Sequence, residues 1–344
     1  MLGVPFPPAS GTYEVRAGLV PLALAGPDDH GPVRFVTDAR ASEYLARKLD
    51  LLEHHADAVR LRVPARSRAD DDALATILRD ALGWLAAEHP ERCVVDGDAI
   101  ALPPFGVLLR GDTVERVAPP APGLGPLARN AQTWLARQRG IDLLADALAL
   151  SVMEDFAVVR APDDDDDPAG DVLELMHICF PSHWAPAEKL GGNFAAVHAP
   201  VANNGVIIGA HRQLVRAMVR KGPLLRYAWS IARDPRLDLN PRLHHLAEPP
   251  AAAYTDPDAA ARATWYRVER QTTNPFPALG RSLFTIRTWV VPMTEVGEDP
   301  ARARQLASAI RSMRDDEADY KGIGKLRAPL VAWLEGRGPA GQGA

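Results

Sequence analysis

Two stretches in the last third of the chain constrain the fold most, because both predict β-strands and both carry charged side chains. Residues 264–272 (Thr-Trp-Tyr-Arg-Val-Glu-Arg-Gln-Thr) and residues 283–291 (Leu-Phe-Thr-Ile-Arg-Thr-Trp-Val-Val) are rich in β-branched and aromatic residues. The connection between them contains Pro275, Pro277 and Gly280, so an antiparallel hairpin is the simplest pairing. We therefore predict that these two stretches form an antiparallel hairpin.

Side chains alternate between the two faces of a strand, and the alternation here is unusual. In the second stretch, Phe284 and Ile286 fall on one face and Arg287 falls on the other. If the apolar face meets the core, Glu269 or Arg270 of the first stretch could stand across from Arg287. A charged side chain in such a strand must be paired or hydrated. Two interpretations stay open: an exposed face with cross-strand ion pairs, or a polar-lined pocket whose arginines hold a carboxylate or phosphate.

Helices are predicted around this sheet. The clearest covers residues 71–88, where apolar residues recur at helical spacing after a run of aspartates that suits a helix N-terminus. Further helices are expected over residues 40–55, 127–139, 142–156, 209–221 and 299–316, and further strands over residues 94–116, 171–180 and 224–231. The mixture predicts an α+β fold.

Proline-rich and glycine-rich segments divide the chain. Residues 1–32 are expected to wrap the surface, with residues 13–22 as a point of anchorage. The Pro-rich connector at residues 117–126 predicts an N-terminal helical and irregular region (1–126), a core (127–325) and a flexible tail (326–344), with one continuous domain as the alternative. The five acids Asp163–Asp167 lack the spacing of a calcium loop and are expected to form a solvated loop.

Composition excludes several classes of protein. The 344 residues carry a formal net charge of −5, which gives no reason to expect nucleic acid as a partner. We expect no membrane span, because an apolar run of about 18 residues is missing, and the first residues do not resemble a signal peptide. Cys93 and Cys179 form neither a disulfide framework nor a zinc pattern, so the cytoplasm is the expected location. Abundant Ala, Arg, Asp and Pro with little Lys suggest a GC-rich bacterial genome.

Residues 175–204 concentrate unusual side chains. They include His177, His183, His198 and Cys179, together with Gly-Gly and three prolines, as expected of a site on loops. Zinc would need a further close ligand or a cysteine pair, whereas haem iron needs only one protein ligand on its proximal side. No P-loop, nucleophile elbow or dinucleotide fingerprint is present, and the residues alone do not decide between a site and a structural corner.

Several blocks, taken in order, resemble one family. They are Met-Glu-Asp-Phe (153–156), Cys-Phe-Pro-Ser-His-Trp-Ala-Pro-Ala-Glu-Lys-Leu-Gly-Gly (179–192), Val-His-Ala-Pro-Val (197–201), Glu-Arg-Gln-Thr (269–272) and Leu-Phe-Thr-Ile-Arg-Thr (283–288). The chain is similar in these blocks to the alpha subunits of haem-dependent oxidative N-demethylases. That resemblance implies a PAS-like antiparallel sheet with helices around it that cradles haem b.

The resemblance also implies an activity. A member of this family would use O2 to remove a methyl group from a small secondary or tertiary amine, with release of formaldehyde. Electrons would come from flavin and a [2Fe–2S] centre on partner proteins, because this chain has no cysteine pattern for a cluster. The alternatives are a PAS-like haem or small-ligand binding protein that senses without turnover, and a structural subunit of a redox complex with a degraded site.

The matching positions carry candidate roles that rest on the resemblance. His198, in the His-x-Pro-Val block, is the candidate iron ligand, with His183 ranked below it. The other candidates are Arg270 and Arg287 for the propionates or the pocket wall, Trp184 for contact with the cofactor, and Glu188 or Glu269 for an ammonium substrate.

Overall fold

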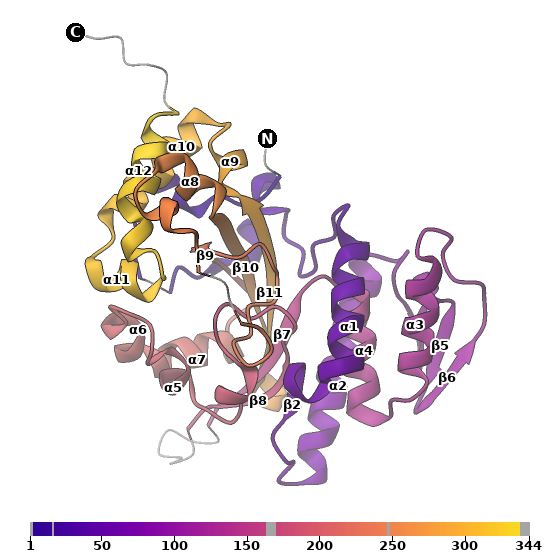
Figure 1. Ribbon diagram of the computed structural model, residues 1–344. Coiled ribbons are helices and arrows are strands. Elements are labelled where there is room, and N and C mark those ends of the chain that lie inside the picture. Colours follow the sequence, from indigo (N-terminus) through magenta and orange to yellow (C-terminus); the bar gives the residue numbers. More distant parts are fainter. Residues whose placement is uncertain (1–2, 16, 163–169, 246–247, 338–344) are drawn as a thin grey trace.

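The computed structural model describes residues 3–15, 17–162, 170–245 and 248–337. Its central element is a seven-stranded antiparallel sheet with the order β1-β9-β10-β11-β7-β8-β2 (Figure 1). The strands are β1 (Val20–Pro21), β2 (Arg60–Arg62), β7 (Asp155–Arg160), β8 (Val172–His177), β9 (Leu224–Ala232), β10 (Trp265–Phe276) and β11 (Arg281–Pro292). Helices pack around this sheet, which confirms the predicted α+β class.

The predicted hairpin is confirmed and is longer than expected. Strands β10 and β11 pair from Trp265 opposite Pro292 to Phe276 opposite Arg281. A short 3-10 turn joins them and ends at Gly280, whose φ of 61° lies in the left-handed region that glycine tolerates best. Pro275 is accommodated within β10 because the pairing with β9 ends at Thr273, so the missing N–H of Pro275 disturbs no ladder on that side.

Four helices and a small sheet form one half of the molecule (Figure 1). The helices are α1 (Ala41–Val59), α2 (Arg68–Glu88), α3 (Gly125–Leu135) and α4 (Gly140–Ser151), and the four-stranded sheet contains β3 (Val94–Asp96), β4 (Ala99–Leu102), β5 (Val107–Arg110) and β6 (Thr113–Arg116). The apolar stripe predicted for residues 71–88 is buried along α2. One hydrophobic cluster runs from Phe35 to Val290 and therefore crosses the boundary expected at residue 126.

The C-terminal helices cover the other end of the large sheet (Figure 1). They are α8 (Pro257–Arg262), α9 (Met293–Val296), α10 (Pro300–Ser312), α11 (Asp315–Tyr320) and α12 (Arg327–Glu335). Tyr266 and Trp289 belong to the hydrophobic cluster that these helices share with the sheet. Leu330 and Leu334 of α12 are fully buried, so the expectation of a flexible tail from residue 326 is wrong for this helix. Residues 338–344 lie outside the described residues.

A second expectation also fails, because the helix predicted over residues 142–156 is too long. Helix α4 ends at Ser151, and Val152 is already extended with φ −124° and ψ 163°. Every residue of the following strand β7 is buried. A strand covered on both faces shows no apolar–polar alternation, so its apolar run looks like the continuation of a helix.

Three short helices lie between β8 and β9 in the chain, and α7 packs against β10. They are α5 (Phe194–His198), α6 (Gly205–Gly209) and α7 (His211–Arg220). Helix α7 confirms the helix predicted over residues 209–221, with Val215, Met218 and Val219 buried on one side. The five acids Asp163–Asp167 lie outside the described residues.

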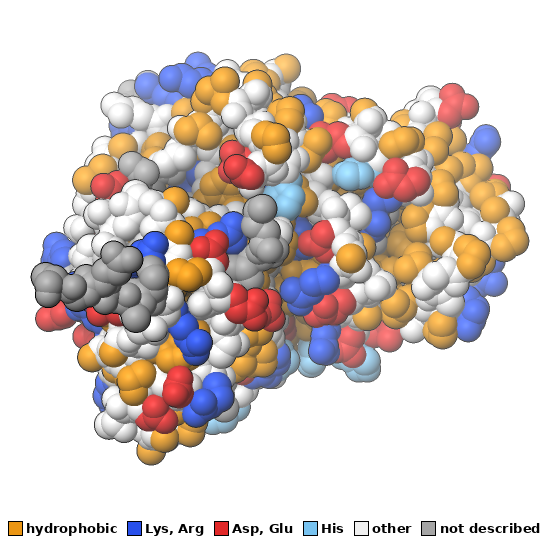
Figure 2. Space-filling view, turned by 90° about the horizontal axis from the view of Figure 1, so that it is seen from above, with side chains coloured by type: hydrophobic (Ala, Val, Ile, Leu, Met, Phe, Trp, Pro, Cys, Tyr) orange, Lys and Arg blue, Asp and Glu red, His pale blue; other side chains and the backbone are white. Residues whose placement is uncertain are grey.

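The surface is unevenly apolar. Hydrophobic side chains gather over the end of the molecule that carries α3, β5 and β6 (Figure 2), and Val117 in the Pro-rich connector is 55% exposed. In the part of the chain that the structure describes, no helix has both the length and the apolar character needed to cross a membrane.

Candidate functional site

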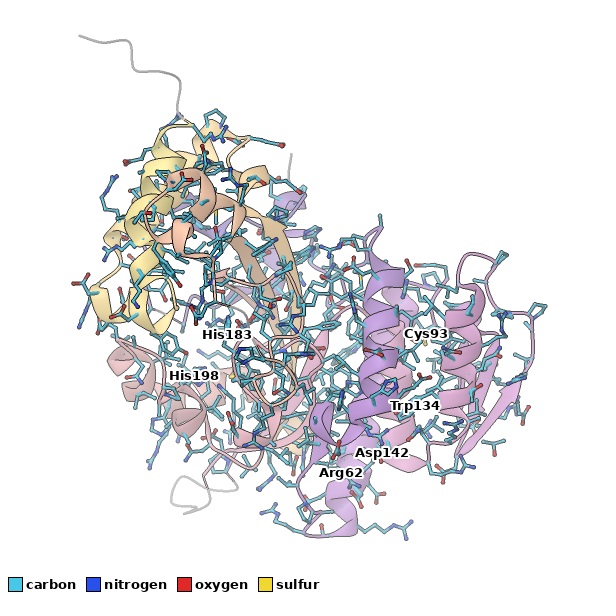
Figure 3. The ribbon with its side chains drawn as sticks, in the orientation of Figure 1. Arg62, Cys93, Trp134, Asp142, His183 and His198 are labelled. Atoms are coloured by element: carbon cyan, nitrogen blue, oxygen red, sulfur yellow. The ribbon has the colours of Figure 1, made fainter. Side chains whose placement is uncertain are left out.

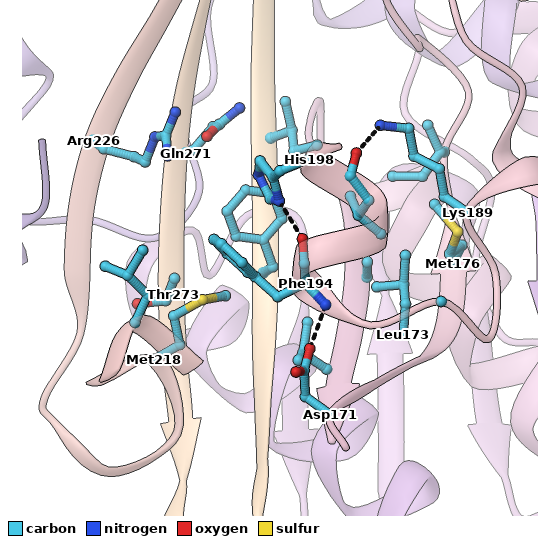
Figure 4. A pocket seen from close by; sticks show the side chains of 18 of the residues that line it. Asp171, Leu173, Met176, Lys189, Phe194, His198, Met218, Arg226, Gln271 and Thr273 are labelled. Atoms are coloured by element: carbon cyan, nitrogen blue, oxygen red, sulfur yellow. Dashed lines mark hydrogen bonds between the residues drawn. The ribbon is translucent and has the colours of Figure 1, made fainter. Parts of the chain in front are cut away.

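A cavity lies between one face of the large sheet and helices α5 and α7 (Figure 4). Its enclosed volume is about 220 Å³, within an open space of about 1100 Å³ that includes solvent. Apolar side chains make up most of its wall: Ala157, Val159, Leu173, Met176 and Ile178 from β7, β8 and the residue after β8, Phe284 and Ile286 from β11, and Phe194, Val197, Leu214 and Met218 from the helices. A wall of this kind suits a largely apolar ligand.

Phe284 and Ile286 show how the predicted alternation is used. They share one face of β11 as expected, but that face lines the cavity and is not packed into a closed core. Arg287 lies on the opposite face, as the alternation predicts, and is fully buried there. Neither interpretation of the hairpin describes this face, because it is buried rather than exposed and its arginines do not line the cavity.

His198 lies on the cavity wall at the end of α5. The helix is fixed at its start by Asn193, whose side chain accepts a hydrogen bond from the Ala196 N–H at 2.8 Å, and by Asp171, which accepts from the Phe194 N–H at 2.5 Å. Nδ1 of His198 lies 2.8 Å from the carbonyl oxygen of Phe194 (Figure 4). The Phe194 ring stacks on the imidazole with a centroid distance of 4.1 Å, so the ring is held in one orientation.

The protonation state of His198 follows from its surroundings. The pKa of His198 is lowered to about 4, mainly by burial and in smaller part by the cations Arg226 and Lys189, while the hydrogen bond with the Phe194 carbonyl acts in the opposite direction. The imidazole is therefore neutral at pH 7. Because the carbonyl oxygen of Phe194 can only accept, Nδ1 carries the proton and Nε2 keeps its lone pair. Among the described residues, Nε2 has no hydrogen-bond partner, which leaves it available to a metal.

Lys189 and Trp184 lie beside this histidine on the cavity wall. The Lys189 ammonium donates to the carbonyl oxygen of Val197 at 3.1 Å and lies 4.7 Å from the centroid of the Trp184 ring. Burial lowers the pKa of Lys189, while Glu188 and Glu269 act in the opposite direction. Through Val197, Lys189 helps to fix the helix that carries His198.

A polar strip crosses the apolar wall along β10 and β9. Glu269, Gln271 and Thr273 alternate along β10 and all face the cavity. Arg226 of β9 lies opposite Gln271 in the register and also faces the cavity, while the Gln271 amide donates to Glu269 at 2.9 Å. Arg226 Nε and Thr273 Oγ1 are buried, and neither has a partner among the described residues. Two unpaired buried polar groups in one cavity indicate that a polar ligand group belongs there.

Two of the predicted site residues lie away from this cavity. Glu188 forms a partly exposed ion pair with Arg242 at 3.2 Å and does not line the cavity wall. His183 has a left-handed φ of 62°, and burial together with Arg267 and Arg233 lowers its pKa. Figure 3 shows His183 and His198 in the same half of the molecule, but only His198 lines the cavity.

Arg270 and Arg287 also lie away from the cavity. Arg270 donates to the backbone carbonyls of Asp29, Gly31 and Val33 at 3.2, 3.1 and 2.7 Å. Arg287 forms an ion pair with Asp38 at 2.6 Å. Neither arginine lines the cavity, because alternation along the strands places both on the opposite face of the sheet, where they bind the N-terminal segment.

Arg226 was missed in the sequence analysis, although a signal for it exists. It lies in the predicted strand at residues 224–231, and pairing of that strand with β10 brings it opposite Gln271. The sequence indicates the polar face of β10. It does not show which strand lies next to β10, because that depends on the order of the strands in the sheet. Sequence reasoning also missed Ala17 and Leu19 of the N-terminal segment, which line the cavity.

A separate polar cluster is buried on the far side of β8. His177 lies 3.1 Å from Asp146 through Nε2 and 3.9 Å from the Cys179 sulfur through Nδ1. Asp146 also accepts from the Trp134 indole at 2.6 Å and from Arg60. Cys179, His177 and Asp146 are all fully buried. Burial raises the pKa of the Cys179 thiol well above its usual value. The cluster is therefore structural.

The comparison with known families agrees with this geometry. A family model described as haem-dependent oxidative N-demethylase, alpha subunit-like, matches residues 38–331. The match covers most of the chain and includes β7 to β11 and every cavity residue except Ala17 and Leu19. The family is haem-dependent by its description, and the cavity offers a neutral histidine with a free nitrogen. The chain therefore belongs to the haem-dependent oxidative N-demethylase, alpha subunit-like family.

Proposed function

We propose that this protein binds haem b in the cavity beside α5 and uses O2 to remove a methyl group from a small secondary or tertiary amine. One observation carries the proposal: His198 presents a neutral imidazole to an apolar cavity, with its proton held on Nδ1 by the Phe194 carbonyl. A backbone hydrogen bond of this kind fixes the tautomer and orientation of a metal-binding histidine. Haem iron needs only one such ligand on its proximal side.

The other residues of the cavity suit haem in two ways. The apolar wall matches the faces of the macrocycle, and the unpaired Arg226 and Thr273 suit the propionate carboxylates. These two residues replace Arg270 and Arg287 as the candidates for propionate contact. A macrocycle needs more room than the enclosed 220 Å³, so the fit requires part of the open 1100 Å³ as well.

Glu269 is the candidate for amine recognition. It faces the cavity and is oriented by Gln271 at 2.9 Å, and its other oxygen lies 3.6 Å from Arg267. A carboxylate in an apolar surrounding binds an alkylammonium group by a charge-assisted hydrogen bond. Glu188, paired with Arg242 outside the cavity, is not carried over into the proposed site.

Haem, when bound, would supply the oxygen chemistry. In the overall reaction one oxygen atom enters a C–H bond of the methyl group, and the other is reduced to water with two electrons and two protons. The resulting N-hydroxymethyl amine breaks its C–N bond to give the demethylated amine and formaldehyde. The cavity residues would bind the amine, orient its methyl group and exclude water.

The electrons would come from partner proteins that carry flavin and a [2Fe–2S] centre. The chain has only two cysteines, and both are buried and free. Four cysteine ligands are the usual requirement of a [2Fe–2S] cluster, so this chain cannot supply them. The family description names an alpha subunit, which is consistent with electron transfer from separate partner proteins.

An absorption titration with haem tests the proposal. We expect a Soret band in the wild-type protein and in His183→Asn, a control histidine that does not line the cavity and whose left-handed φ asparagine tolerates. His198→Gly should lose the band and regain it when imidazole is added. A band in His198→Gly identical to that of the wild type would refute the ligand assignment.

Turnover needs a second measurement. The haem-loaded protein, supplied with a flavin and [2Fe–2S] reductase and a small secondary or tertiary methylamine, should release formaldehyde and consume O2 in equal amounts. Haem binding without formaldehyde release would favour the second candidate, a haem-binding sensor. Absence of any Soret band in the wild type would refute both.

A further inference from the structure

One wall of the cavity comes from the beginning of the chain. Ala17 and Leu19 line the cavity, whereas the other lining residues among those the structure describes come from residues 157–286. The family match begins at residue 38, so this wall lies outside the region that the family shares. We call residues 17–22 the N-terminal wall.

The N-terminal wall is attached to the edge of the large sheet. Val20 and Pro21 form β1 and pair with Leu225 and Leu224 of β9. Leu22 is buried, and its N–H donates to the carbonyl oxygen of Pro223 at 2.8 Å. A strand of two residues provides little backbone pairing, so the position of this wall depends on contacts to either side of it.

Those contacts lie on the opposite face of the sheet and among the C-terminal helices. After the wall, Arg270 binds three carbonyls between residues 29 and 33. Before it, the Tyr13 N–H donates to Ser312 Oγ at 2.8 Å, and the rings of Tyr13 and Trp229 form a T-shaped pair with their centroids 5.6 Å apart. The wall is therefore fixed at both ends by side chains that do not themselves line the cavity.

Leu19 lines the same cavity as Arg226, a cation of β9. Val20 pairs with Leu225 and Pro21 with Leu224, so extending this register by one residue brings Leu19 opposite Arg226. Directly opposite residues of an antiparallel pair share one face, and both Leu19 and Arg226 do line the cavity. Burial lowers the pKa of Arg226, as expected where an apolar side chain keeps water from a guanidinium group.

We propose that Leu19 is a specificity-determining residue, which seals the Arg226 end of the cavity and selects ligands with an anionic group on an apolar body. Arg226 and Thr273 supply the unpaired polar atoms for the anion. Leu19 excludes the water that would otherwise solvate it. The inference that this wall helps to select haem rests on the proposed function. The inference that the cavity selects an apolar anion does not.

Two substitutions in adjacent positions test the role of Leu19. Leu19→Trp should fill the Arg226 end, whereas Val20→Trp is the matched control, because Val20 is 47% exposed and does not line the cavity. Anilinonaphthalene sulfonate serves as an apolar anionic probe in fluorescence titrations of the protein without haem. We expect roughly tenfold weaker probe binding in Leu19→Trp and no change in Val20→Trp.

A third variant, Leu19→Ala, makes the side chain at position 19 smaller instead of larger. Leu19→Ala should raise the rate of haem loss to excess apomyoglobin by about tenfold, because it lets water reach Arg226, with Val20→Ala as the control. Urea unfolding of the variants shows whether each remains folded. Equal probe binding and equal haem loss in the position-19 and position-20 variants would overturn the inference. A wild-type protein that binds the probe as described but never binds haem would instead refute the proposed function.

Discussion

Arg270 and Arg287 stand directly opposite each other on β10 and β11, and both bind the N-terminal segment on the face of the sheet away from the cavity. Like charges in such a pair repel each other, so each needs its own partners. Arg270 has three backbone carbonyls. Arg287 has Asp38 and lies 4.3 Å from the ring centroids of both Tyr44 and Trp289.

Replacing Arg287 should therefore destabilise the fold and leave the ligand site intact. Arg287→Met removes a fully buried partner of Asp38, and we expect a loss on the order of 3 kcal/mol in the free energy of unfolding. Urea denaturation measures this change. Arg220→Met, at an exposed position of α7, is the control and should be near neutral. A folded Arg287→Met protein that has lost haem binding would contradict the structural role.

Thr273→Val should have opposite effects on the free and the ligand-bound protein. The hydroxyl of Thr273 is buried and has no partner among the described residues, so an isosteric apolar side chain should stabilise the haem-free protein by about 1 kcal/mol. The same change removes a donor for a propionate and should weaken haem binding. Thermal unfolding without haem and an absorption titration with haem measure the two effects. Thr133→Val is the control, because Thr133 is an exposed helix residue far from the cavity.

Glu269→Gln should affect the amine more than the fold. Loss of a charge-assisted hydrogen bond to an alkylammonium group costs about 1.5–3 kcal/mol, which corresponds to roughly a tenfold to hundredfold rise in KM. Steady-state formaldehyde release measures this, with kcat and KM separated. Glu188→Gln is the matched control and should behave as wild type, since its carboxylate pairs with Arg242 outside the cavity. An equal effect of both substitutions would contradict the assignment of Glu269.

Lowering the pH should reduce the stability of the folded protein at the N-terminal segment, because His30 resists protonation there. Burial lowers the pKa of His30 below its usual 6.5, and Arg270 and Arg287 lower it further. Below pH 6.5 the unfolded chain binds a proton that the folded chain does not, so stability falls as the pH drops from 6.5 towards the folded-state pKa. His30→Asn, which tolerates the left-handed φ of 62°, should flatten this part of the stability profile. Urea midpoints between pH 5 and 7 for both proteins provide the test, and identical slopes would contradict it.

The hairpin shows how far the sequence leads. Alternation in residues 283–291 correctly separated Phe284 and Ile286 from Arg287. The alternation could not show which face lines the cavity and which carries the buried arginines, because both faces of this sheet are covered. The same property concealed β7, where six consecutive buried residues leave no polar position to mark a strand.

The site was predictable in parts. The block around His198 could be recognised because its motif is local in the sequence, and His198 does line the cavity. Arg226 and Leu19 were out of reach, since their positions depend on which strands become neighbours of β10 and β9. The propionate roles expected for Arg270 and Arg287 rested on the resemblance, and strand alternation places both side chains on the face of the sheet away from the cavity.

The order of the large sheet has a consequence for biosynthesis. Its two outermost strands, β1 and β2, come from the first 62 residues, while the five strands between them come from residues 155–292. The ribosome therefore releases both border strands long before the strands they must cover exist. Until β1 and β2 dock, the borders of the inner strands β9 and β8 remain open to strands of other chains. We expect nascent or partly unfolded chains to be prone to aggregation, and the docking of these two short strands to end that period.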